Sequence, residues 1–247
     1  MVKYLSLPTG EKKDFAELSL KELDIRLPLR AGITLKKTGN MKNPMAGRNS
    51  FFKLLGIDES RIYSCRQTHS KRVLDIENGS PKKYSSFKAD GLITENMDAV
   101  LTVTVVDCLP LFIIDRTKSV FCILHSGWKG TGIILNAISI FRSKYNCRPE
   151  DLQVIIGPGI GSCCYEVEKA RYESFRSQFG SQSVKMAGKR FYLDLKNANV
   201  HLLLEGGINN IAVVRDCTFC NQDLASFRRD GPVNYIHMLA FIGNIHS

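Results

Sequence analysis

Two apolar runs near the middle of the chain each end beside a residue that can bind a metal ion or act as a nucleophile. The run over residues 100–106 is followed by Cys108, and the run over residues 120–124 is followed by His125. Short runs of Val, Ile, Leu and Thr bounded by Pro and Gly predict buried strands. We therefore expect a thiol and an imidazole to face each other at the ends of adjacent strands, as a metal site or a thiol-based active site requires.

A second imidazole, that of His69, is flanked by strand-like apolar runs and precedes a polar Ser-Lys-Arg segment. With Cys108 and His125 it completes a Cys/His/His set. Such a set leaves the fourth position of a tetrahedral zinc ion open and is typical of a catalytic site. One thiolate and two neutral imidazoles give Zn²⁺ a net charge of about +1, so the ion could hold an anion, polarise a phosphate or acidify a water. The spacing alone leaves other chemistries open.

Two alternatives use the same residues. In a cysteine hydrolase, Cys108 is the nucleophile and His125 is its base, without a metal. In a copper oxidase these side chains bind copper, but an oxidase of that kind needs further clustered histidines. The chain has five histidines in all, so copper is disfavoured and zinc is the expected cofactor.

The composition is that of an ordinary globular protein with a basic surface. Of the 247 residues, 44% are hydrophobic and 23% are charged, and the formal net charge is +10. That charge favours an anionic partner. The Lys and Arg residues are scattered and form no basic arm interleaved with aromatics, so we expect a small-molecule partner and no nucleic acid. A basic nucleic-acid-binding module is the non-enzymatic alternative.

We expect a cytoplasmic protein without a membrane partner. The N-terminal segment has no apolar signal core, and the longest apolar segment, residues 99–114, is interrupted by Asp107 and Pro110. The eight cysteines are then expected to be reduced thiols. Cys217 and Cys220 have CxxC spacing, but a zinc ribbon needs two such pairs and there is no second, so structural cysteines rather than zinc ligands are the better hypothesis for them.

The elements that position these residues are expected to form a single domain over residues 1–247, because no repeat, linker or composition break divides the chain. Residues 1–30 have the pattern of edge strands and turns. Residues 31–56 should form a strand, a loop and a helix, with Arg48 just before the helix, where it could meet an anion. Further helices are predicted at 131–145, 168–180 and 194–205, and further strands at 61–77 (a pair), 154–156, 191–193, 208–214 and 235–242.

Six short motifs occur in an order that resembles one family. They are QTHS at 67–70, ADGLIT at 89–94, DCLP at 107–110, HSGWKG at 125–130, IGPGIGSCCYEV at 156–167, and CT with SFRRDG at 217–231. Over residues 30–242 the chain is similar to the YfiH-type family, also called laccase-domain or polyphenol oxidase proteins. The family is regarded as purine nucleoside phosphorylases with adenosine deaminase activity. Its zinc ligands, carried over by motif, are His69, Cys108 and His125.

The resemblance implies an α+β fold, a four-layer α/β/β/α sandwich with mixed sheets, in a chain that we expect to be a monomer. It implies phosphorolysis of adenosine, inosine, guanosine or 5′-methylthioadenosine, and deamination of adenosine. Phosphate would be held by the zinc site together with Arg48, Gln67, Arg228 or Arg229. Asp107 is a candidate for orienting a ligand or moving a proton, with a structural role as the alternative. The family is also associated with correcting a cell-wall precursor, which would make the chain an amidase-like hydrolase.

Overall fold

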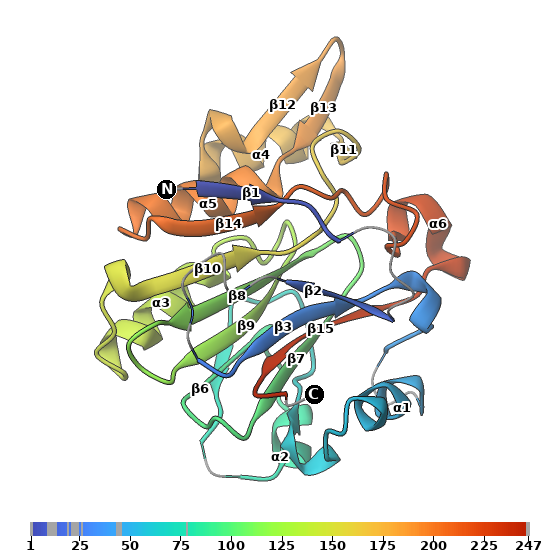
Figure 1. Ribbon diagram of the computed structural model, residues 1–247. Coiled ribbons are helices and arrows are strands. Elements are labelled where there is room, and N and C mark those ends of the chain that lie inside the picture. The colour runs from blue at the N-terminus through green and yellow to red at the C-terminus, as the bar shows by residue number, and fades with distance from the viewer. Residues whose placement is uncertain are drawn as a thin grey trace.

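The chain forms two mixed β-sheets that pack face to face, as the computed structural model shows (Figure 1). The larger sheet has the strand order β1 (Val2–Leu5), β14 (Asn210–Val214), β10 (Leu152–Ile156), β8 (Leu109–Asp115), β9 (Phe121–Ser126), β6 (Gly91–Thr94) and β5 (Val73–Asp75). The smaller sheet has the order β2 (Phe15–Leu18), β3 (Arg30–Thr34), β15 (Met238–Gly243), β7 (Val100–Val105) and β4 (Ile62–Tyr63). The described residues are 2–8, 14–18, 20, 25, 27–42, 46–77 and 79–245.

Six α-helices, four 3₁₀ helices of three residues each and a small third sheet complete the described part of the chain. The third sheet contains β11 (Glu166–Val167), β13 (Arg190–Leu193) and β12 (Val184–Ala187). The helices are α1 (Ala46–Leu54), α2 (Pro81–Ser85), α3 (Ile133–Ser143), α4 (Lys169–Phe179), α5 (Leu195–Glu205) and α6 (Phe227–Asn234). In Figure 1, α3, α4 and α5 lie on the side of the larger sheet, whereas α1 and α2 lie by the smaller one.

Three apolar cores separate four layers. Along β8, Leu111 and Ile113 join the core beneath α3, α4 and α5, whereas Phe112 and Ile114 join the core between the two sheets. This alternation follows from the two-residue period of a strand. On the outer face of the smaller sheet, Phe241 of β15 packs against the aromatic rings of α1. The order helix, sheet, sheet, helix confirms the predicted α+β fold with four α/β/β/α layers.

Most predicted elements are confirmed. The three long helices predicted at 131–145, 168–180 and 194–205 are α3, α4 and α5. The strands predicted near both termini are also present, and β1 and β2 are edge strands as expected. Other parts of the prediction for residues 1–30 lie outside the described residues, because residues 1, 9–13, 19, 21–24 and 26 are not described.

The two runs around Cys108 and His125 are not adjacent strands, which corrects one prediction. The first run is β7 of the smaller sheet, and the second is β9 of the larger sheet. A further strand, β8, lies between them and pairs antiparallel with β9, with Pro110 opposite His125. The sequence pattern predicts a strand end at Pro110, but proline is tolerated near the start of a strand, and Pro110 is the second residue of β8. Cys108 therefore immediately precedes a strand that pairs with that of His125.

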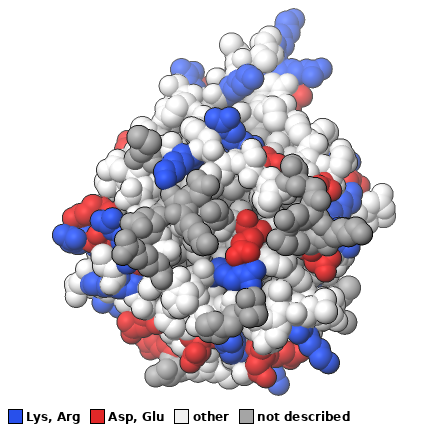
Figure 2. Space-filling view, viewed as in Figure 1, with Lys and Arg blue, Asp and Glu red and all other residues white. Residues whose placement is uncertain are grey.

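Two smaller predictions are also corrected. The strands predicted as a pair in residues 61–77 do not pair with each other, because β4 joins β7 in one sheet and β5 joins β6 in the other. Arg48 lies in the first turn of α1 rather than before it. No helix in the described residues has the length and apolar character needed to cross a bilayer. On the face seen in Figure 2, Lys and Arg lie mostly singly or in small groups among Asp, Glu and uncharged residues.

Candidate functional site

The three predicted metal ligands meet where the chain passes between the two sheets. His69 lies in the segment that leads from β4 to β5, and Cys108 lies in the segment that leads from β7 to β8. Both segments leave the smaller sheet and enter the larger one, and His125 stands near the end of β9. The donor atoms of the three side chains all lie within 4.8 Å of one another, with 4.0 Å between Cys108 Sγ and His69 Nε2.

Both crossover segments contain a residue in the left-handed backbone region. The φ angle is 58° at His69 and 67° at Asp107, which immediately precedes Cys108. A non-glycine residue in this region is strained by roughly 1–3 kcal/mol, so the surrounding structure must hold it there. Two of the few such residues in the described chain therefore lie at or beside proposed ligands.

Asp90 supplies the contacts that hold the first of these segments. Its carboxylate is buried just before β6 and accepts backbone N–H groups of Thr68, His69 and Ser70 at 3.1, 3.0 and 2.6 Å. It also accepts the Ser70 hydroxyl at 2.8 Å and lies 2.9 Å from His125 Nδ1. Burial alone would raise the pKa of Asp90, but hydrogen bonds from His125, Ser70 and Thr68 lower it to about 2.

The hydrogen bond to Asp90 fixes the orientation of His125. With Nδ1 held by a carboxylate, Nε2 is the nitrogen that remains for a ligand, which is the arrangement that metal-binding histidines usually adopt. Burial opposes ionisation of Cys108, yet His125 and His69 lower the pKa of its thiol. A cysteine with this tendency towards the thiolate is a suitable metal ligand.

The arrangement fits a tetrahedral metal ion the size of zinc. Zn–S and Zn–N bonds of ordinary length would separate a sulfur and a nitrogen ligand by about 3.6 Å, close to the 4.0 Å between Cys108 and His69. Gly127 keeps the space open, since a Cβ there would lie 2.6 Å from Cys108 Sγ and 3.5 Å from His69 Cδ2. The donor set and the space both suit a metal with one open position.

A cavity of about 720 Å³ opens over these ligands. Seven of the eight residues proposed from the sequence line it: Arg48, Gln67, His69, Asp107, Cys108, His125 and Arg228. Arg229 does not. Its guanidinium donates to the backbone oxygens of Thr218, Phe219, Asn221 and Leu224, and it pairs with Asp230. Arg229 therefore holds the loop before α6 and does not lie at the cavity, where contact with phosphate was predicted.

Arg48 is the cation of the cavity that is both buried and without an acidic partner. It is 5% exposed, and its Nη2 donates to the Thr102 hydroxyl of β7. Within the described ranges no carboxylate pairs with it. Burial lowers the pKa of Arg48 to about 10, so the guanidinium is still charged at neutral pH. A buried cation without a counter-ion is unfavourable unless an anion joins it.

Gln67 lines the cavity, but its amide is already engaged. Nε2 donates to the Thr104 carbonyl at 2.8 Å, and Oε1 accepts both the Thr104 N–H and hydroxyl at 2.8 Å. The side chain thereby extends the edge pairing of β7. These bonds hold the His69 segment against the smaller sheet, and the predicted contact of Gln67 with substrate stays a prediction.

Asp107 is similarly committed. Its Oδ1 accepts the Thr218 hydroxyl at 2.6 Å, and its Oδ2 accepts the Arg228 N–H at 2.8 Å. These bonds favour the structural alternative over the proton-transfer role. The guanidinium of Arg228 donates to the Glu166 carbonyl and lies 5.5 Å from the Tyr165 ring centroid.

Several residues in or beside the site were missed by the sequence interpretation. Asp90 does not line the cavity, and from the sequence it is predicted only as part of a turn, because an Asp-Gly pair is a common turn signal. The aromatic side chains of Tyr165, Phe227 and Tyr235 carried no ligand signal, and neither did His237. The Nδ1 atom of His237 is buried without a hydrogen-bond partner, although the ring lines the cavity. Burial, with Lys42 and His125 nearby, lowers the pKa of His237, so its ring is neutral at pH 7.

Comparisons with known proteins agree on one family. The family model for multi-copper polyphenol oxidoreductase laccase matches residues 34–244. Purine nucleoside phosphorylase YlmD from Geobacillus stearothermophilus is 29% identical over 245 residues, which cover 86% of this chain and 89% of that protein. Purine nucleoside phosphorylase LACC1 from Mus musculus is 31% identical over 196 residues, 76% of this chain and 44% of LACC1, so the chain spans less than half of that relative. Adenosine deaminase RL5, from an unknown prokaryotic organism, is 28% identical over 184 residues, 68% of this chain and 69% of RL5.

Solved structures have the same fold. The crystal structure of YlmD from Geobacillus stearothermophilus matches with a TM-score of 0.85 at 25% identity, over 98% of this chain and 100% of that one. Bacillus licheniformis YfiH matches with a TM-score of 0.82 at 27% identity, over 93% and 96%.

Replacing Cys108 by Ala removes the only sulfur from the ligand set. We expect Cys108→Ala to lose one equivalent of zinc per chain relative to the unmodified protein, measured by elemental analysis after purification without chelator. Cys147→Ala, which removes a thiol from the core beneath the helices, is the matched control and should keep its zinc. Unchanged zinc content in Cys108→Ala would contradict the site.

Replacing Asp90 by Asn keeps the shape of the side chain but replaces one acceptor oxygen by an NH2 donor, which would face the donors of residues 68–70 or of His125. We expect zinc affinity to fall about 10- to 100-fold because the carboxylate orients His125. The free energy of unfolding should fall by about 1–3 kcal/mol or more. Chelator competition and urea unfolding measure the two effects. Ser70→Ala removes the hydroxyl contact with Asp90 and a longer one from the Arg72 N–H, but keeps the carboxylate at His125, so zinc affinity should be nearly unchanged. Equal affinities in all three proteins would refute the role of Asp90.

Proposed function

The chain belongs to the multi-copper polyphenol oxidoreductase laccase family, and we propose that it is a zinc-dependent purine nucleoside phosphorylase with adenosine deaminase activity. Relatives named purine nucleoside phosphorylase and adenosine deaminase support an enzyme of nucleoside chemistry. The proposed substrates are phosphate and the purine nucleosides adenosine, inosine, guanosine and 5′-methylthioadenosine. One observation carries the proposal: a buried arginine that has no acidic partner among the described residues lines the same cavity as a Cys/His/His metal-ligand set.

The charge of the cavity suits an anionic substrate. Among the described residues, five Lys or Arg side chains line it against the single carboxylate of Asp107. The five are Lys42, Arg48, Arg66, Arg171 and Arg228. Lining of one sign raises the local concentration of a phosphate ion and favours its entry.

Arg48 is the residue proposed to hold the nucleophile. Its planar guanidinium can donate two parallel hydrogen bonds to phosphate oxygens. A further oxygen of the same hydrogen phosphate then forms a bond to C1′ as the C1′–N9 bond breaks. The electron pair of that bond leaves with the purine, and the phosphate proton ends on the purine, giving ribose 1-phosphate and the free base. Fixing phosphate against C1′ removes much of the entropy barrier of this reaction.

The aromatic residues of the cavity suit a purine. The rings of Phe227 and Tyr235 lie 5.0 Å apart between centroids, and those of Tyr235 and His237 lie 5.3 Å apart. Such a row offers flat apolar surface to a base. The neutral ring of His237, with Nδ1 unsatisfied, is proposed to hydrogen-bond a purine nitrogen and to assist its departure.

His69, Cys108 and His125 are the residues proposed to hold the metal. When bound, zinc would supply positive charge for phosphate and would lower the pKa of the water that deamination requires. In deamination, water adds at C6 of adenosine and ammonia leaves, giving inosine without phosphate. Asp90 keeps His125 oriented in both reactions. Copper is the lesser alternative, because five histidines are too few for the clusters of a multicopper oxidase.

A metal-free thiol hydrolase is the second candidate, and one observation favours it. Asp90, His125 and Cys108 form a carboxylate–imidazole–thiol series, in which Asp90 raises the pKa of His125 and His125 lowers that of Cys108. This is the arrangement of an activated cysteine nucleophile. The substrate would then be an acyl compound such as the cell-wall precursor. Rapid alkylation of Cys108 in active, metal-free protein would support this candidate over the phosphorylase.

Replacing Arg48 by Ala removes the proposed phosphate ligand. We expect the KM for phosphate to rise about 10- to 100-fold, because a charge-assisted hydrogen bond contributes about 1.5–3 kcal/mol, while the KM for nucleoside changes little. Initial rates at varied phosphate measure this. Arg142→Ala, which removes an exposed arginine near the end of α3, is the control and should behave as the unmodified protein. An unchanged phosphate KM would remove Arg48 from the site.

The two activities should differ in their need for phosphate. Cleavage of adenosine should consume phosphate and yield ribose 1-phosphate with adenine, whereas deamination should persist after phosphate is removed. Both rates should fall together in His125→Ala, by roughly 10³-fold or more, because loss of a ligand weakens the binding of the metal ion that both reactions need. Separation of adenine, inosine and ribose 1-phosphate from a nucleoside panel measures this. Zinc-loaded protein with neither activity would refute the proposal and favour the amidase-like role.

A further inference from the structure

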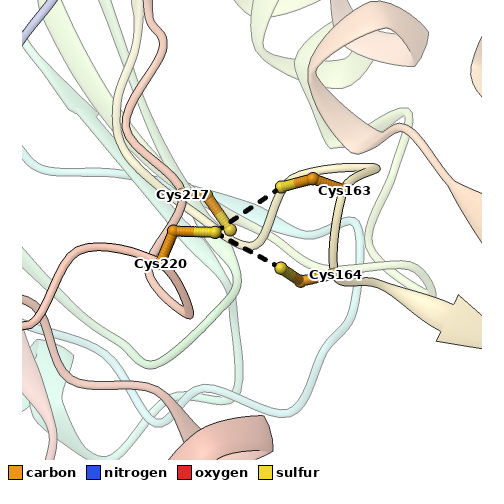
Figure 3. Close-up of side chains that lie close together, drawn as sticks. All are labelled: Cys163, Cys164, Cys217 and Cys220. Carbon is orange, nitrogen blue, oxygen red and sulfur yellow. Dashed lines mark hydrogen bonds between the residues drawn. The ribbon is translucent and has the colours of Figure 1, made fainter.

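Four cysteines from two distant segments meet on the surface beside the active cavity (Figure 3). Cys163 and Cys164 follow the glycine-rich loop after β10, and Cys217 and Cys220 follow β14. Cys220 Sγ lies 3.9 Å from Cys163 Sγ and 3.4 Å from Cys164 Sγ, and all four sulfur atoms lie within 4.8 Å of one another. All four are free thiols, and none of them lines the cavity.

The sulfur positions match a tetrahedral thiolate site. Four sulfur ligands at ordinary Zn–S bond lengths would lie about 3.8 Å apart, a value within the separations found here. A set of four thiols selects soft or borderline ions such as zinc and excludes hard oxygen-seeking ones. We propose that Cys163, Cys164, Cys217 and Cys220 bind a second zinc ion, separate from the one proposed at His69, Cys108 and His125. On binding, four Zn–S bonds form, four thiol protons pass to solvent, and no electron is transferred.

Two tight turns present the four thiols in pairs. In one turn, the N–H groups of Cys220 and Asn221 both donate to the Cys217 carbonyl. In the other, the N–H groups of Cys164 and Tyr165 both donate to the Gly161 carbonyl. Gly161 also lets the turns approach, because a Cβ there would lie 3.2 Å from Cys163 Sγ and 3.4 Å from Cys217 Cβ.

Nearby groups could balance the negative charge of four thiolates around one divalent ion. The Gly161 N–H donates to Cys217 Sγ at 3.2 Å. Lys196 is 9% exposed, and its ammonium donates to the carbonyls of Arg215 and Asp216, immediately before Cys217. The ammonium also faces the carboxylates of Asp194 and Asp216, so its charge is shared between these two groups and the thiol of Cys217.

The proposed ion would fasten one wall of the active cavity. The loop after β10 contributes Ile160 and Tyr165 to that wall. On the other segment, Thr218 follows Cys217 and holds the Asp107 carboxylate, which precedes Cys108. The two segments also meet through a bridge between Gly159 and Cys217. We therefore assign the second zinc a structural role, in which it holds the segments that position Asp107.

Elemental analysis of the full chain, purified with reductant and without chelator, tests the proposal. We expect two zinc equivalents in the unmodified protein and in Cys147→Ala, one in Cys220→Ser and one in Cys108→Ala. Two equivalents in Cys220→Ser, or one in the unmodified protein with no further loss in Cys220→Ser, would overturn it. If the protein shows no nucleoside activity, the expected zinc equivalents per chain stay the same. The proposal of a four-cysteine zinc site and the proposal of a nucleoside reaction are therefore tested independently.

Cobalt substitution gives a second readout that does not depend on the folding of Cys220→Ser. In Cys108→Ala, Co²⁺ should occupy the remaining site and give the intense thiolate-to-cobalt charge-transfer and tetrahedral absorption bands of a sulfur-rich site. These bands should weaken in the double variant Cys108→Ala/Cys163→Ser, in which an exposed ligand is replaced. Absence of the bands in Cys108→Ala, or disulfide bonds among the four cysteines in reduced protein, would refute the site.

Discussion

The buried carboxylate of Asp90 is the contact on which the candidate active site depends. Its side chain accepts five hydrogen bonds, four from residues 68–70 and one from His125. The Asp90 backbone also connects the His69 segment with β9. Its N–H donates to the Arg72 carbonyl, and its carbonyl accepts the His125 N–H. A buried carboxylate is tolerated only when it is fully satisfied, and here its satisfaction fixes the positions of two ligands at once.

One carboxylate can hold two ligands because the segment with His69 passes from the smaller sheet to the larger one, which carries His125, and Cys108 lies in the other segment that crosses in this way. Apolar cores on both faces of the larger sheet hold its strands rigidly, so short segments between sheets can keep strained backbone angles at His69 and Asp107. The same crossings explain why the cavity draws on both sheets, with Thr102 and Thr104 from the smaller sheet and His125 from the larger. Ligand geometry is therefore set by the packing of the whole sandwich.

Local patterns predicted the long helices, the buried strands and the ligand-bearing turns, since period and composition decide these. They did not reveal that β7 and β9 belong to different sheets, because a strand buried on both faces has no alternation to indicate its partner. They also missed Asp90, whose role depends on donors brought from residues 68–70. Arg229 and Gln67 both have the right chemistry for phosphate, but tertiary contacts that the sequence does not show occupy the polar atoms of both side chains, and of the two only Gln67 lines the cavity. The adjacent cysteines at 163–164 belong to one of the family motifs, but they gave no metal signal because they lack the CxxC spacing.

The two proposed metal sites differ in whether the ion keeps a position open for a ligand from solution. One is inferred from the family, and the other is proposed from the structure. The Cys/His/His set would leave one position of its ion open towards a cavity rich in positive charge, which suits the proposed reaction with an anion. The four-thiol set has no open position, so its ion would have no site for substrate and could only hold segments together. Thr218 and Asp107 connect the two, since each follows or precedes a ligand and they share a hydrogen bond of 2.6 Å. Loosening the closed site should therefore displace the backbone at Cys108, which makes the structural ion a condition for the accuracy of the open one.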